Sequence, residues 1–101
     1  MHSLSDLRNL HTTCLVIDTA STLVQVGLIQ SARQDVWFSS EEDAGQGLFR
    51  CLEKLPLPLK SIAAIAFCEG PGSLLGIRTA AMALRVWDAV TPRPLYAFQS
   101  L

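Results

Sequence analysis

The sequence predicts an α/β domain: a mixed five-stranded sheet with helices on its faces. Three observations indicate this fold class. Three short apolar segments separated by polar turns open the chain, a continuously apolar run follows at 62–68, and a long helical pattern links that run to a last apolar segment. Because right-handed crossovers join strands that follow helices in this order, we expect the later strands to be parallel.

The composition indicates one domain with an interaction surface. A chain of 101 residues has the usual size of a single domain. Half of its residues are hydrophobic and 17% are charged, against about 25% charged residues in an average soluble domain. We therefore expect residues 1–13 to form an N-terminal tail, 14–101 to share one core, and some apolar surface to face a partner.

The cellular compartment is predicted from the absence of membrane and signal segments in the sequence and from its cysteines. No apolar run reaches the roughly 20 residues that span a bilayer, and residues 1–13 have no signal-peptide core. The three cysteines are odd in number, widely spaced and set among apolar residues, which favours buried free thiols in a reducing compartment. We expect a cytoplasmic protein without membrane contact. A net charge of -1 with scattered cations predicts no direct nucleic-acid binding.

The first half of the chain has the pattern of an antiparallel meander. The run from Cys14 to Ile17 predicts a buried strand, and the alternation from Val24 to Leu28 predicts a second. The polar turn between them contains hydroxyl side chains and one carboxylate. Residues 35–38 predict a third strand.

Two helices and two further strands are expected after the meander. A helix at about 41–55 would begin with a capping box of Ser39 and Glu42, and Pro56 would end it. The run 62–68 predicts a strand that is covered on both faces, because it has no polar alternation. A second helix is expected from Ser73 to about Val90, followed by a last strand at 95–98.

The turn between the buried strand and the second helix is a candidate anion site. Gly70 and Gly72 permit close backbone approach, and Ser73 can cap a helix whose free N–H groups favour an anion. The glycines could equally serve only a tight turn. Asp18 and Thr19, at the end of the first strand, could hold a hydrated magnesium and a phosphate, or could bond their own backbone in an Asx turn.

Arg78 lies in the first turn of the expected helix, where a cation opposes the helix dipole. We expect it to have a compensating partner: Glu69 across the turn, a partner chain or a ligand anion.

The sequence contains few residues that could catalyse a reaction. No histidine lies near a candidate nucleophile in the sequence, and no metal-binding motif is present, so no catalytic residue and no metal site is predicted.

Three segments together resemble a known family. Residues 16–20 have the sequence VIDTA, residues 70–78 have GPGSLLGIR, and residues 99–101 have QSL. Their order and spacing resemble the N-terminal lobe of the TsaB (YeaZ) family, formerly grouped with the peptidase M22 glycoproteases. The resemblance covers 14–101. It implies an actin-like ATPase (ribonuclease H-like) lobe, with the second lobe of the family absent from the sequence.

The resemblance also implies a function. It indicates the non-catalytic partner subunit in the synthesis of threonylcarbamoyladenosine at position 37 of tRNAs, so we expect an accessory subunit rather than an enzyme. The partner would be a TsaD-like catalytic paralogue or a second copy, paired through the two helices, and tRNA would be met only through the complex. The interface residues expected on these helices are Leu48, Leu52, Ile77, Ala81 and Leu84.

Two alternatives remain beside this function. An ATP-binding actin-fold lobe with kinase-like or ATPase activity would use Asp18, Thr19, Gly70, Gly72 and Ser73. We expect no cofactor to be bound by this chain itself, and ATP and magnesium to belong to the full complex. A glycoprotease is suggested by the old family label. The catalytic paralogue itself is disfavoured, because its metal-binding histidine pair would follow the last strand and QSL stands there instead.

The sequence departs from the family pattern within the best-matched segment. Leu74 and Leu75 replace a Phe-Thr pair, and Glu69 stands where a polar or basic residue is common. A carboxylate at the mouth of the turn would repel phosphate. Nucleotide binding is therefore expected to be weak in this lobe alone.

Overall fold

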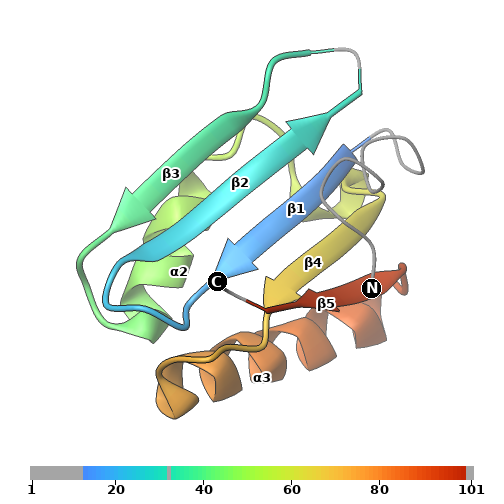
Figure 1. Ribbon diagram of the computed structural model, residues 1–101. Coiled ribbons are helices and arrows are strands. Elements are labelled where there is room, and N and C mark those ends of the chain that lie inside the picture. The colour runs from blue at the N-terminus through green and yellow to red at the C-terminus, as the bar shows by residue number, and fades with distance from the viewer. Residues whose placement is uncertain (1–12, 32, 100–101) are drawn as a thin grey trace.

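A computed structural model describes residues 13–31 and 33–99, and a single mixed sheet organises them. The strands β1 (Thr13–Asp18), β2 (Val24–Gln30), β3 (Val36–Ser40), β4 (Ala64–Cys68) and β5 (Leu95–Phe98) lie in the order β3-β2-β1-β4-β5 (Figure 1). The pairs β1–β2 and β2–β3 are antiparallel, whereas β1–β4 and β4–β5 are parallel. The predicted α/β class is confirmed: a meander forms one half of the sheet and two crossovers form the other.

The helices α2 (Ala44–Glu53) and α3 (Leu74–Val90) pack on the same face of this sheet (Figure 1). Small and medium side chains such as Leu48 and Cys51 of α2, and Ala80 and Leu84 of α3, are buried against it. The sheet contributes alternate residues, because side chains two apart share a face. This core contains Leu15 and Ile17 of β1, Val24, Val26 and Leu28 of β2, and Ile65 of β4.

The opposite face of the sheet has its own buried cluster. It comprises the other alternate residues, Cys14, Val16, Ile29, Ala64 and Ala66, with Tyr96 and Phe98 packed against them. Burial raises the pKa of the Cys14 thiol to about 11, although a backbone hydrogen bond from Ala66 partly offsets the effect. The thiol therefore behaves as a buried hydrophobe.

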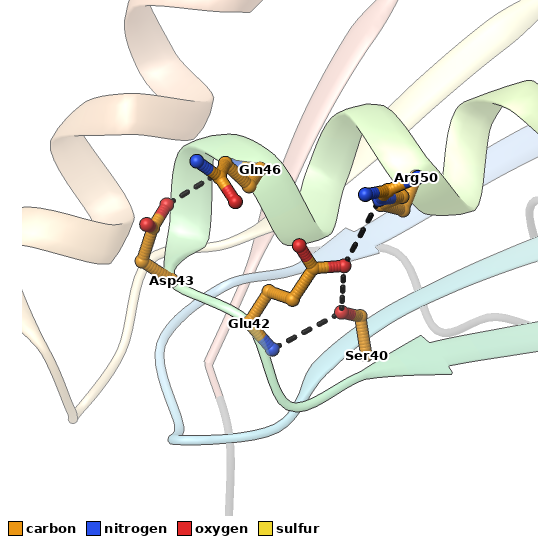
Figure 2. A network of polar contacts seen from close by, with 5 residues as sticks. All are labelled: Ser40, Glu42, Asp43, Gln46 and Arg50. Carbon is orange, nitrogen blue, oxygen red and sulfur yellow. Dashed lines mark hydrogen bonds and ion pairs between the residues drawn. The ribbon is translucent and has the colours of Figure 1, made fainter.

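The start of α2 differs from the prediction. Asp43 is the N-cap, and its Oδ1 accepts a hydrogen bond from the Gln46 backbone N–H at 3.0 Å (Figure 2). The capping box expected from Ser39 is wrong, because Ser39 lies in β3 and pairs with Gln25 of β2. Strand pairing holds the chain extended through Ser40, and the helix begins at Ala44 after the Asp43 cap.

The crossover between α2 and β4 contains a short 3-10 helix, η1 (Leu59–Ser61), which delays β4 to Ala64. The guanidinium of Arg93, in the loop between α3 and β5, donates from Nη1 to the Leu59 carbonyl at 2.6 Å. The two crossover connections are therefore tied together at the end of the sheet where α3 ends. In the part of the chain described, no helix is long and apolar enough to cross a bilayer.

Candidate functional site

The candidate site lies where the parallel strands end. β1 ends at Asp18 and β4 at Cys68, and since the two strands are parallel, the loops that follow them meet at one edge of the sheet. Crevices at this edge are the usual ligand sites of open α/β sheets. A cleft of about 430 Å³ lies here between the β1–β2 turn and the first residues of α2 and α3.

The β1–β2 turn is held by its own backbone and by α3. The Oδ1 atom of Asp18 accepts from the Ala20 backbone N–H at 2.9 Å, which is an Asx turn. The hydroxyl of Thr19 is buried and donates to the Gly76 carbonyl at 2.6 Å. Each side chain thus bonds a backbone group of the chain, and Asp18 is not among the residues that line the cleft.

The glycine-rich turn packs directly on this hairpin. Gly70 and Gly72 have positive φ values of 114° and 155°, which favour glycine. The Ser73 N–H donates to the Ala20 carbonyl at 2.5 Å, and the Ser73 Oγ accepts from the Gly76 N–H at 3.1 Å. A Cβ at Gly72 or Gly76 would overlap a backbone carbonyl of the hairpin. These glycines therefore allow two loops to touch backbone to backbone.

Several polar groups of this turn are already bonded within the chain. The Ser73 N–H donates to the Ala20 carbonyl, and the Ser73 hydroxyl caps its own helix. Glu42 and Asp43 also line the cleft and add negative charge. The nucleotide role expected for Asp18, Thr19, Gly70, Gly72 and Ser73 stays a prediction, and the contacts among these residues explain their arrangement without a ligand.

The entrance to the cleft beside α2 contains a small polar network. The Glu42 carboxylate accepts from Arg50 Nε at 3.2 Å and from the Ser40 hydroxyl at 3.4 Å (Figure 2). The pair is solvent-exposed, so its contribution to stability is small. The two charges are paired with one another, and the described residues that line the cleft include no lysine or arginine.

Arg78 is exposed on α3 and has no hydrogen bond or ion pair with any residue that the structure describes, Glu69 included. Arg85, two turns further along the helix, is likewise exposed and without such a partner in the described ranges. Both cations are therefore available to a partner outside this chain.

The predicted interface residues do not lie on the outer surface. Leu48 and Leu84 are buried in the core, and Leu52 packs against it. Ile77 and Ala81 are half-buried. Leu48, Leu52 and Leu84 therefore attach the helices to the sheet, whereas Ala81 also lines a shallow hollow on the outer side of α3. The interface role of the five positions stays a prediction.

Sequence reasoning missed the outer apolar surface of the helices. It consists of exposed side chains on α3 and one on α2: Leu74, Leu75, Met82, Val86, Val90 and Phe49. A second apolar stripe with spacings of seven and four, at 75, 82 and 86, is the signal that could have revealed it. Because α3 has apolar residues on both its inner and its outer side, the helical pattern alone did not distinguish the exposed stripe from the buried one.

In residues 13–31 and 33–99, no group of three or more histidine, cysteine, aspartate or glutamate side chains could hold an ion. Cys14, Cys51 and Cys68 are buried free thiols. Burial raises the pKa of Cys51 as well, against the opposing charge of Lys54.

No protein-family model and no curated protein sequence matches the chain. Solved structures do match it. YeaZ from Pseudomonas aeruginosa superposes with a TM-score of 0.80 and 26% sequence identity, over 89% of this chain and 44% of that one. The chain is a structural relative of YeaZ. An uncharacterized protein described as similar to peptidase YeaZ from Pseudomonas aeruginosa matches with a TM-score of 0.77 and 25% identity, over the same shares of the two chains.

The match confirms the resemblance seen in the sequence and the fold that it implies. YeaZ has an actin-like, ribonuclease H-like fold, and the mixed sheet with its two helices conforms to it. The chain spans less than half the length of YeaZ. What the complete YeaZ protein does is therefore a proposal for this chain.

Proposed function

We propose that the chain is an accessory lobe of the TsaB (YeaZ) type, which docks through α2 and α3 on a TsaD-like actin-fold protein and supports threonylcarbamoyladenosine formation at position 37 of tRNA. The observation that supports this most is the superposition on YeaZ at 26% identity over nearly the whole chain. A shared fold by itself would not indicate a function. Here the GPGSxxGxR segment at 70–78 adds to it.

The packing of the glycine-rich turn supports an accessory role over a nucleotide-binding one. The backbone N–H groups of Ser73 and Gly76 are used within the chain, and Gly72 and Gly76 pack on a neighbouring loop. Its effect is to fix the N-terminal end of α3 against the sheet. A helix fixed in this way can present a constant surface to another protein.

The composition of the helix surface supports docking. Exposed large apolar side chains cluster on α3, where a solvated helix would have charges. The three buried free thiols suit the reducing cytoplasm, where we propose that the protein works.

The test is binding to a TsaD-like protein, followed by light scattering and calorimetry. We expect a complex with one copy of each chain, and stimulation of tRNA modification when the remaining components are present. A chain that binds no TsaD-like protein, but is stabilised against heat by ATP and magnesium, would instead indicate the nucleotide-binding alternative.

A further inference from the structure

The outer face of α3 presents two unpaired cations at a regular spacing. Arg78 and Arg85 are seven residues apart, which places them on one side of the helix about 10.5 Å apart along its axis. Ala81 and Met82 lie between them and complete a shallow hollow of about 340 Å³. Among the described residues, neither guanidinium has a hydrogen-bonding or ionic partner.

Apolar side chains lie beside the arginines. Leu75, Met82 and Val86 are 75%, 69% and 63% exposed, and their spacing places them along one stripe. Exposed apolar surface flanked by arginine is the composition of protein interfaces, in which arginine is enriched and lysine is depleted. α3 contains no lysine.

The charges on this face do not complement a second copy. The single acidic residue within α3 is Asp88, which is half-buried and accepts from the Arg93 backbone N–H at 3.4 Å. Arg78 and Arg85 are equally distant from the midpoint between Ala81 and Met82. If two copies of α3 packed antiparallel about that midpoint, each Arg78 would face Arg85 of the other copy, and like charges would repel.

We propose that this face docks an α-helix of a different protein, one with two carboxylates about two turns apart on either side of apolar side chains. Such a helix would place a carboxylate opposite each guanidinium, where arginine binds it with two parallel hydrogen bonds. Its apolar side chains would cover Met82 and the neighbouring stripe. The inference deepens the proposed function and rests on it for the claim that α3 lies in the interface.

The test supplies the missing charges on the same scaffold. The double variant R78E/R85E has carboxylates at the required spacing on an otherwise identical helix. Wild-type and variant chains are mixed in equal amounts at low salt and compared with each chain alone by sedimentation velocity. We expect a heterodimer in the mixture and monomers in the separate samples, with association weakened about tenfold or more at about 0.5 M salt.

A matched control is R33E/K60E, which changes the charge equally at exposed cations outside α3. Its mixture with wild type should remain monomeric. A monomeric mixture of wild type with R78E/R85E, when both chains give native circular dichroism, would overturn the inference. So would self-association of the wild type that L75S/M82S abolishes. Binding of a short single-stranded RNA that requires both arginines, with no heterodimer in the mixture, would assign the face to phosphates instead.

The two proposals fail separately. If a TsaD-like protein binds the wild type and R78E/R85E equally well, the role of the arginines is wrong and the accessory function stands. If no TsaD-like protein binds, but the charge-reversed mixture associates, the accessory function is wrong and the acidic-helix surface stands.

Discussion

The hydroxyl of Thr19 donates a hydrogen bond to the carbonyl of Gly76 at 2.6 Å, across 57 positions of sequence. It joins the β1–β2 hairpin to the first turn of α3. We expect the substitution Thr19→Val to lower the free energy of unfolding by about 1 kcal/mol, because it keeps the side-chain shape and removes one buried hydrogen bond. Urea denaturation measures this. Thr22→Val, at an exposed position of the same turn, should leave stability unchanged.

Gly76 and Gly45 should respond to alanine in opposite directions. A Cβ at Gly76 would overlap the Thr19 carbonyl oxygen, a backbone atom that cannot move alone. Gly76→Ala should therefore cost about 3 kcal/mol. A Cβ at Gly45, within α2, meets only the Asp43 carboxylate at 3.6 Å. Gly45→Ala should raise helix stability by about 0.5 kcal/mol. Thermal melting of both variants checks the sign, and equal effects would contradict the packing described.

The N-cap of α2 should matter more than its ion pair. Asp43→Ala removes the acceptor of the Gln46 N–H and should cost about 1 kcal/mol. Arg50→Ala removes the exposed pair with Glu42 and should cost less than about 0.5 kcal/mol. Chemical denaturation at low and high salt distinguishes them, because most of the cap effect is a hydrogen bond that should persist in high salt, whereas the effect of the exposed ion pair should disappear.

The buried thiol of Cys14 should make stability depend on alkaline pH. Its pKa is about 11 in the folded chain and 9.0 when exposed. The unfolded chain therefore loses this proton first. Its contribution to stability is complete below pH 9 and decreases as pH rises towards 11, by up to about 1.4 kcal/mol per pH unit.

Cys14→Ala isolates that effect. The variant loses packing at every pH, but its stability should fall less steeply between pH 9 and 11 than that of the wild type. Folded wild type should also resist alkylation of Cys14 at pH 8, because the thiol is protonated and buried. Identical slopes for the two proteins would show that Cys14 does not titrate differently in the two states.

The strands could be predicted from the sequence because their patterns are local. The run before Asp18 and the alternation from Val24 are visible without any partner strand, and both occur where expected. The start of α2 could not be predicted in the same way. Ser39 has the residue type of a helix cap, and only its pairing with Gln25 across the sheet assigns it to a strand.

In the candidate site, too, local sequence features could be predicted, whereas contacts between distant segments could not. The glycines of the turn could be recognised as a motif in the sequence, but the sequence did not show why glycine is required there. The atoms that exclude a Cβ at Gly72 and Gly76 are carbonyls of Ala20 and Thr19, more than fifty residues earlier. The outer face of α3 was missed because apolar residues occur on both sides of that helix, so its period does not separate the core from the surface.

Both ends of α3 are fastened through backbone carbonyls. Thr19 binds the carbonyl of Gly76 at one end, and Arg93 binds the carbonyl of Leu59 beyond the other. None of these bonds involves a side chain on the outward face. That face can therefore accumulate substitutions, in evolution or in design, without shifting the helix. Related chains could keep this scaffold and exchange one binding partner for another.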